Sequence, residues 1–200
     1  MNKGFVSKDK LDNYRVDLML IHYTYVNNEK FISKKANSFT KKYNDYSKNN
    51  NDKIRQCIND YATRTISYSL LESGITQMYH LFEQFVKLYF NLDVEEEYKF
   101  VKKTAKKYDY DLKENEYFDL MNKYRLLNNA IKHGGLDNLK KEYPELINGD
   151  TSDNEYGTIL DDKLNITEKN LDECCVCLYE YVEEMYYYFE DMNFSEGDEQ

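Results

Sequence analysis

Apolar residues recur every three or four positions along most of this chain, which is the spacing of amphipathic helices. The pattern is continuous from residue 11 to residue 46 and again from residue 54 to about residue 90. Between these stretches lies the polar run 47–52, which predicts a short loop, and Asp52 is the expected N-cap of the second helix. Two long helices joined by so short a loop predict an antiparallel αα-hairpin.

Shorter helices are predicted after the hairpin. One covers about residues 93–108, and another covers about residues 117–133 with aromatic and aliphatic side chains on one side. Gly134–Gly135 should end the second of these helices, because glycine readily takes the left-handed conformation of a helix C-terminus. A further turn or two of helix is expected at residues 136–142, before Tyr143–Pro144.

The remainder of the chain is predicted as a loop followed by one long helix. Residues from about 148 to 165 are rich in Asn, Asp, Gly and Ser and are expected to form a mobile loop. The last helix should begin with Thr167 as its N-cap. Asn170 stands where a glutamate would complete a capping box, so we expect that box to be incomplete.

Turn-forming residues are scarce, since the 200 residues include seven glycines and a single proline. This scarcity favours long helices over β-structure. We therefore expect an all-α fold, a helical bundle of about five helices that consists of two long antiparallel helices and several shorter ones. Residues 1–194 should form a single helical domain, and residues 195–200 a disordered acidic tail.

The net charge is −10 and the pI is about 4.9, which argues against broad, non-specific binding of nucleic acid. Such binding requires many Lys and Arg side chains to displace counterions. Local groups of lysines are still present and are either contacts for nucleic acid or simply solvated helix faces. These groups are Lys34, Lys35, Lys41 and Lys42, and Lys102, Lys103, Lys106 and Lys107.

No apolar stretch reaches 18 residues, and the N-terminal sequence lacks the apolar centre of a signal peptide. We therefore expect a cytoplasmic protein with no membrane segment.

Three of the four cysteines crowd one helix, where neighbouring side chains point apart, so neither a disulfide framework nor a zinc site is expected. The cysteines should be buried free thiols, and no metal or other cofactor is expected.

Rare residues gather near the middle of the chain, in the run from Arg125 to Gly135. The chain has only four arginines and three histidines, and Arg125 and His133 share this run with Asn129. Positions four and eight residues apart on a helix differ by about 40° and 80°, so these three side chains form one polar stripe. Arginine can grip a phosphate and histidine can move a proton. Alternatively, His133 only complements the dipole of the helix C-terminus.

Two segments resemble the HEPN superfamily, small helical bundles of prokaryotic toxin–antitoxin, abortive-infection and CRISPR-associated systems. One is the stretch from Leu70 to Phe85, which looks like the second long helix of that fold. The other is Arg125-Leu-Leu-Asn-Asn-Ala-Ile-Lys-His133-Gly-Gly, followed by the segment 139–146 with its proline. The resemblance covers about residues 11–190 and implies a HEPN-like bundle.

The resemblance also implies a metal-independent endoribonuclease site at the interface of a homodimer. By this analogy Arg125 binds the scissile phosphate, His133 acts as general base or general acid, and Asn129 orients one of them. Asn128 is an alternative contact to the phosphate. Further substrate-binding residues are expected at Lys132, Lys102 and Lys106. Such a protein would be an effector of antiviral defence or a toxin, with RNA as substrate and an antitoxin or a phage-derived protein as a possible partner.

Seven residues separate Arg125 from His133, whereas the family motif has four to six. A second hypothesis is therefore a non-catalytic HEPN-like module that binds a protein or nucleic acid, and a third is a structural helical adaptor. No phosphate-binding loop, zinc-protease motif or hydrolase nucleophile elbow is present in the sequence.

Four further features have two interpretations each. Glu83 either holds Arg125 or His133 or is a surface acid, and His22 and His80 are expected at a surface or an interface. The tyrosines of the last helix either stack on bases or pack within the bundle.

Overall fold

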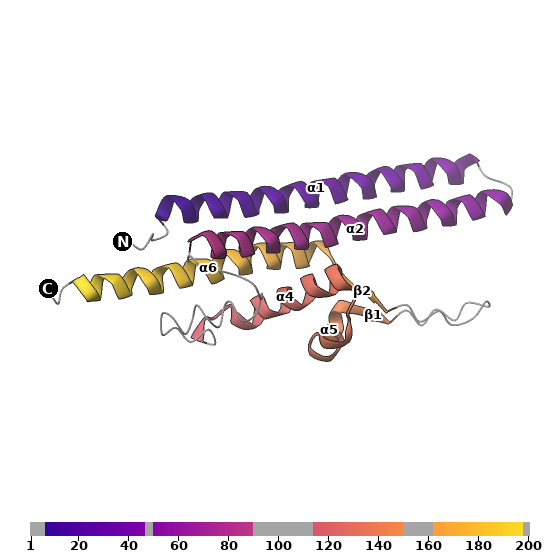
Figure 1. The fold of residues 1–200 in the computed structure, drawn as a ribbon. Helices are drawn as coiled ribbons and strands as arrows, with labels where there is room; N and C mark the ends of the chain where they lie inside the picture. Colours follow the sequence, from indigo (N-terminus) through magenta and orange to yellow (C-terminus); the bar gives the residue numbers. More distant parts are fainter. Residues whose placement is uncertain (1–6, 47–49, 90–113, 150–161, 198–200) are drawn as a thin grey trace.

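The computed structural model describes residues 7–46, 50–89, 114–149 and 162–197, and its regular structure is mostly helical (Figure 1). The predicted all-α bundle, with two long helices and several shorter ones, is confirmed. In chain order the elements are α1 (Lys8–Tyr46), α2 (Asn50–Tyr89), α4 (Phe118–His133), α5 (Asp137–Glu142), the 3-10 helix η2 (Pro144–Leu146), β1 (Ile147–Gly149), β2 (Asp162–Leu164) and α6 (Glu168–Gly197).

Helices α1 and α2 form the predicted antiparallel hairpin. The ring of Tyr14 in α1 stacks on Phe85 in α2 with centroids 4.3 Å apart, so the start of one helix lies beside the end of the other. Helix α2 begins at Asn50, so the prediction that Asp52 is its N-cap is wrong.

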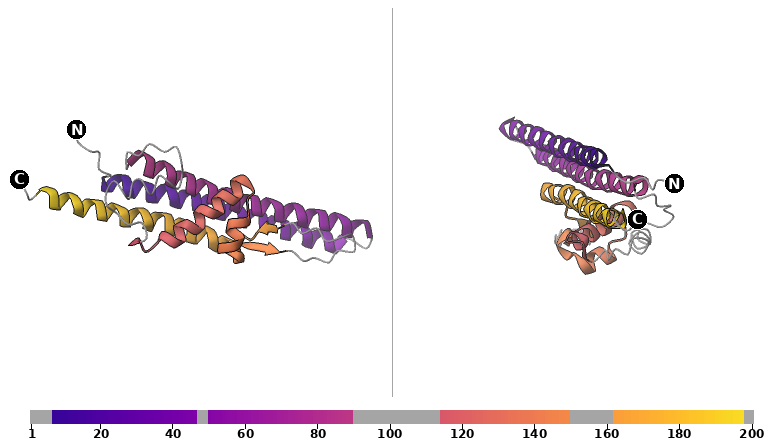
Figure 2. Two further views of the ribbon diagram at one scale, coloured as in Figure 1. Left: turned by 60° about the horizontal axis from the view of Figure 1, so that its bottom comes forward. Right: turned by 90° about the vertical axis from the view of Figure 1, so that its left-hand side faces the viewer.

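The helices lie in layers, with α2 and α6 between α1 on one side and α4 on the other (Figures 1 and 2). Helix α6 packs on α2, where Phe82 meets Tyr181 edge to face at 6.0 Å between ring centroids. The closed end of the hairpin, between Tyr46 and Asn50, projects beyond α4 and α6 (Figure 1).

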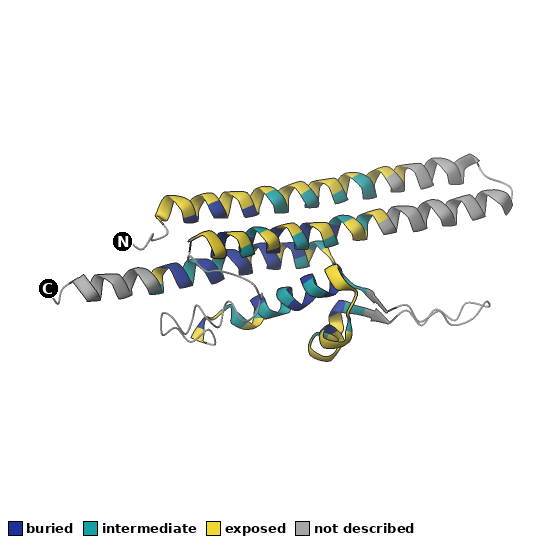
Figure 3. Ribbon diagram, in the orientation of Figure 1, coloured by how far each residue is buried: buried dark blue, intermediate teal, exposed yellow. Residues whose placement is uncertain are grey.

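The core lies where α1, α2, α4 and α6 run beside one another (Figure 3). Its cysteines bear out the prediction of buried free thiols, because Cys174 and Cys177 are fully buried and Cys175 is 9% exposed. Burial raises the pKa of Cys175 to about 11 and that of Cys177 to about 12. These thiols are therefore protonated and unreactive at neutral pH. The side chain of Cys57 lies outside the described residues.

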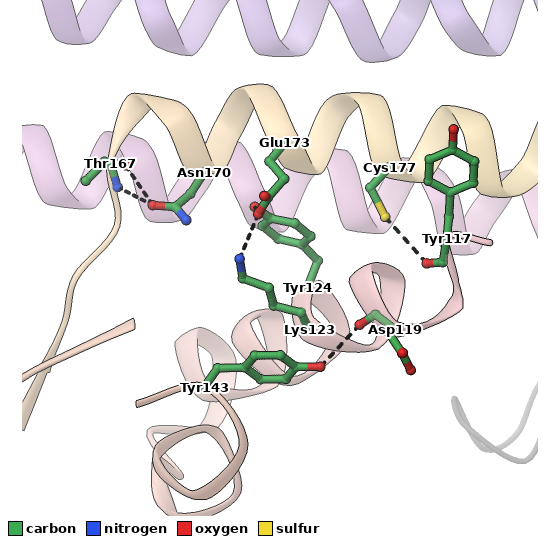
Figure 4. Close-up of polar contacts among 9 residues, drawn as sticks. All are labelled: Tyr117, Asp119, Lys123, Tyr124, Tyr143, Thr167, Asn170, Glu173 and Cys177. Carbon is green, nitrogen blue, oxygen red and sulfur yellow. Dashed lines mark hydrogen bonds and ion pairs between the residues drawn. The ribbon is translucent and has the colours of Figure 1, made fainter. Parts of the chain in front are cut away.

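Helix α4 is attached to α6 by polar contacts as well as by apolar packing (Figure 4). Lys123 Nζ and Tyr124 Oη both donate to Glu173 Oε2, at 2.7 and 2.6 Å. One turn further along α6, Cys177 Sγ lies 4.0 Å from the carbonyl oxygen of Tyr117. These contacts fix which side of α4 faces the core and which side faces outward.

The segment between α5 and α6 differs in part from the prediction of a loop. Ile147 pairs with Leu164 and Gly149 with Asp162 in an antiparallel two-stranded ribbon, so the ends of the predicted loop 148–165 are ordered strands. Residues 150–161 lie outside the described residues. The residues that flank the ribbon, Leu146 before β1 and Ile166 after β2, are buried in the core.

The ends of α6 also refine the sequence predictions. Thr167 precedes the first residue of α6, as expected, and Asn170 Oδ1 accepts hydrogen bonds from the Thr167 backbone N–H at 2.9 Å and its hydroxyl at 2.8 Å. Asn170 therefore performs the part of a capping-box glutamate that the sequence analysis expected to be missing. Helix α6 continues to Gly197, so the predicted tail at residues 195–200 is helical over its first three residues.

Candidate functional site

The candidate site is the outward face of α4, which carries the polar stripe predicted from the sequence. His133 is the last residue of this helix and is exposed. Gly134 follows with φ of 70° and donates its backbone N–H to the Ala130 carbonyl at 2.8 Å, which is the predicted left-handed helix end. Among the described residues, no heavy atom lies within 4 Å of the position of a Cβ on Gly135, so they leave the surface beside His133 open.

Arg125 lies on the same face, one turn before the middle of the stripe, and is partly buried. Its Nε and Nη2 donate to Asn122 Oδ1 at 3.1 and 2.8 Å. Two N–H groups that share one acceptor oxygen hold the guanidinium in a defined orientation on the helix surface. Asn122 was not identified as a site residue, although its position three residues before Arg125 on the same helix face was a usable signal.

Arg125 and His133 lie at the two ends of the stripe. His133 comes eight residues after Arg125, which separates their Cα atoms by about 12 Å along the helix axis. Asn129 lies midway between them, and its side-chain oxygen is buried and has no hydrogen-bond partner in the described part of the chain. The stripe is therefore an extended row with an unsatisfied amide oxygen at its centre.

Asn128, an alternative phosphate contact, faces the core. It is fully buried, and within the described ranges neither its amide nitrogen nor its oxygen forms a hydrogen bond. A buried polar group without partners typically costs about 1–3 kcal/mol. The structure thus brings Arg125, Asn129 and His133 to one face and places Asn128 in the core.

Lys132 connects the stripe to α2. Its Nζ lies 3.8 Å from Glu83 Oε2, and the same oxygen lies 3.9 Å from His80 Nδ1. Glu83 therefore contacts the residue that precedes His133 and is more than an isolated surface acid. His80 is exposed, as expected, and its Nε2 is 2.8 Å from Gln84 Nε2.

The region around the glycines is basic although the whole chain is acidic. From Lys123 to Lys141 the sequence has five Lys and Arg residues and a single carboxylate, Asp137. Lys132, Lys140 and His133 are exposed around the turn that joins α4 to α5. The other predicted substrate contacts, Lys102 and Lys106, lie outside the described residues.

Other candidates from the sequence have structural positions. His22 Nε2 lies 2.6 Å from Asp172 Oδ1 and so links α1 to α6. Tyr179, Tyr181 and Tyr186 of α6 are buried, which bears out packing within the bundle, whereas Tyr187 is exposed.

The described residues form neither a metal-binding cluster nor a membrane-spanning helix. They contain no group of three or more His, Cys, Asp or Glu side chains that could hold a metal ion. No helix among them combines the length and the apolar character needed to cross a membrane.

Comparisons with known proteins add no relative. No protein-family model matches the chain, and neither the curated proteins nor the solved structures contain a match. The likeness to HEPN proteins therefore rests on the two sequence segments, and the geometry of α4 is the basis for any functional argument.

Proposed function

We propose that this chain is a metal-independent endoribonuclease of the HEPN type, an effector of antiviral defence or of a toxin–antitoxin system, whose site is completed by a second copy. The observation that carries the proposal is the arrangement of Arg125, Asn129 and His133 along one face of α4, with His133 exposed at its end. A cation and a titratable base on one surface are what phosphodiester cleavage requires.

The separation of about 12 Å suggests how two copies combine. If two α4 helices pack antiparallel about a two-fold axis at Asn129, Arg125 of one copy lies opposite His133 of the other. Each pair then forms one of two equivalent sites. The open surface beside Gly135 leaves room for such an approach.

The chemistry follows from the two side chains. His133 takes the proton from a ribose 2′-OH, and the 2′ oxygen attacks phosphorus. Arg125 stabilises the negative charge of the phosphorane. The bond to the 5′ oxygen then breaks, that oxygen takes up a proton, and the products are a 2′,3′-cyclic phosphate and a 5′-OH end.

Single and mixed variants test this proposal. His133→Ala should abolish cleavage of RNA without changing the circular dichroism spectrum, whereas His80→Ala, a change at another exposed histidine, should retain it. Mixing Arg125→Ala chains with His133→Ala chains should restore about a quarter of the activity, because half of the dimers are mixed and each has one intact site. Undiminished cleavage by His133→Ala would refute the proposal, and a mixture without activity would refute the shared site.

A non-catalytic binding module is the second candidate. It is favoured by the two hydrogen bonds that already engage Arg125 with Asn122. This candidate predicts that the wild-type chain does not cleave RNA, that His133→Ala leaves partner binding unchanged, and that Lys102→Glu with Lys106→Glu weakens it.

A further inference from the structure

Helix α1 has a second apolar face, which points away from the core. Its buried residues include Leu11, Tyr14 and Leu18, yet large apolar side chains on the opposite side are more than half exposed. These are Val16 at 52%, Met19 at 56%, Leu20 at 58% and Tyr23 at 68% exposed, and we refer to them as the outer stripe. Their spacing of three, one and three residues is that of a helix face that packs on another helix.

The outer stripe continues onto α6. Arg15 lies over the ring of Tyr179 at 4.7 Å and His22 contacts Asp172, so both residues of α1 face α6. Met19 lies between Arg15 and His22 on the helix, and therefore at the same seam. Val176, one turn after Asp172 on α6, is 56% exposed. Contiguous exposed apolar surface of this kind is typical of protein interfaces.

The charges that flank the outer stripe point to its occupant. Asp9 and Asp12 lie two turns and one turn before Val16, and Lys30 and Lys34 lie two and three turns after Tyr23. All four are exposed. The face is thus acidic at one end and basic at the other. An antiparallel copy of the same helix would oppose unlike charges, whereas a parallel copy would oppose like charges.

We propose that a second copy of this chain packs antiparallel on the outer stripe of α1, about a two-fold axis between Met19 and Leu20. This axis pairs Val16 with Tyr23 of the other copy, and Asp9 with Lys30. The apolar pairs supply the attraction, and the charged pairs at the rim fix the direction.

Existing ion pairs do not prevent this arrangement. In the single copy Asp12 Oδ1 is 3.8 Å from Lys8 Nζ, and Lys30 contacts Glu168. All of these side chains are exposed to solvent, and exposed ion pairs contribute little to stability, so their exchange costs little.

This interface differs from the one proposed for the ribonuclease. Helix α1 lies on the opposite side of α2 and α6 from α4 (Figures 1 and 2). Loss of the α1 contact therefore leaves the α4 stripe in place, and each proposal can fail without the other.

The first test is the mass of the assembly by sedimentation equilibrium. Leu20→Glu should raise the dissociation constant at least tenfold, because it places a carboxylate at the two-fold axis. Its helix content should not change, since Leu20 is 58% exposed. Leu88→Glu is the matched control, because Leu88 is 71% exposed but lies on α2, outside the outer stripe. The proposal is overturned if Leu20→Glu leaves the mass of the assembly unchanged. It is also overturned if the wild-type chain is monomeric at every concentration.

Disulfide trapping then tests the direction of packing. In a Cys57→Ser background, where the described cysteines are buried, oxidation should cross-link Leu20→Cys chains to each other. Val16→Cys should not cross-link to itself, because position 16 of the second copy is about 10 Å away along the axis, beyond the reach of a disulfide. A mixture of Val16→Cys and Tyr23→Cys chains should cross-link. Self-linking of Val16→Cys with no mixed product would refute the antiparallel arrangement.

A charge exchange supplies an independent check. Asp9→Lys alone places a lysine at position 9 opposite Lys30 of the second copy, and Lys30→Asp alone places an aspartate opposite Asp9. Either change should weaken association several-fold in low salt. The double exchange should restore wild-type association. Equal association in all four proteins would contradict the pairing of Asp9 with Lys30.

Discussion

Gly74 lies where three helices meet, and its replacement by alanine should destabilise the fold. A Cβ at this position would lie 2.9 Å from Leu171 Cδ2 in α6 and 3.2 Å from Tyr25 Cβ in α1. Favourable contacts between carbon atoms are about 3.5–4.0 Å long. Leu171 is fully buried, so its side chain has little room to turn away. Alanine therefore requires α1 and α6 to shift away from α2.

Two effects of the Gly74→Ala change oppose each other. Alanine in a helix interior is more favourable than glycine by about 1 kcal/mol. Overpacking a well-packed core typically costs about 1–3 kcal/mol, and here contacts to two different helices are compressed. We expect overpacking to exceed the helix propensity gain, which leaves a net loss of up to about 2 kcal/mol in the free energy of unfolding. For a chain of this size, a loss of about 2 kcal/mol lowers Tm by roughly 4–8 °C.

Urea denaturation followed by circular dichroism measures this loss. Ser73→Ala is the matched control, because Ser73 is the exposed neighbour of Gly74 and its change should alter stability by only a few tenths of a kcal/mol. Combined with Leu171→Ala, the Gly74→Ala change should cost less than it does alone, since the truncated leucine leaves room for the methyl group. A higher Tm for Gly74→Ala would refute the reasoning, because it would mean that the helices separate at no cost.

Three further changes have expected outcomes. Asn128→Leu should raise the free energy of unfolding by about 1–2 kcal/mol in urea titrations, because it removes an amide that is buried without partners in the described residues. Burial alone raises the pKa of Glu173, but hydrogen bonds from Lys123 and Tyr124 lower it, and the net pKa is below the ordinary value of 4.5. On acidification below that pH, Glu173→Gln should therefore lose less stability than the wild-type chain. In a chain with Cys57→Ser, a thiol reagent at neutral pH should label the three cysteines of α6 only after unfolding.

Each of these outcomes has a clear opposite. Destabilisation by Asn128→Leu would show that the amide has a stabilising role. Parallel pH dependence of Glu173→Gln and wild type would mean that the carboxylate is not favoured by folding. The sign follows from the lowered pKa: the ionised form is favoured in the folded state, and its contribution is lost as pH falls through the folded-state pKa. Rapid labelling of the folded chain would contradict the burial of the thiols.

Local features of the fold were predictable because local patterns determine them. The period of the apolar residues identified α1, α2, α4 and α6, and the glycine pair located the end of α4. The predicted N-cap at Asp52 was wrong because asparagine is tolerated in a first turn as well as in a loop, so α2 begins at Asn50, three residues before the predicted first helical residue 53. The two strands on either side of residues 150–161 were not predicted, because the content of Asn, Asp, Gly and Ser in this segment indicated a loop.

Contacts between distant segments were not predictable from one sequence. Glu83 meets Lys132 across 49 positions of the sequence, and Lys123 meets Glu173 across 50. Such pairs depend on how the helices cross, which a helical period does not determine. For the candidate site, the sequence identified the stripe of Arg125, Asn129 and His133, but it did not reveal that Asn122 engages the guanidinium.

The position of α1 and α4 on opposite sides of α2 and α6 has a consequence for symmetry (Figure 2). If the two proposed interfaces form, either one alone gives an isologous dimer, which closes and adds no further copies. A chain that uses both faces has two neighbours, so growth continues until a dihedral tetramer closes or an open filament forms. The number of completed α4 pairs would then rise steeply with protein concentration. The ribonuclease activity of such a protein would increase sharply above a certain protein concentration. Contact through one face would then bring copies together that pair through the other face.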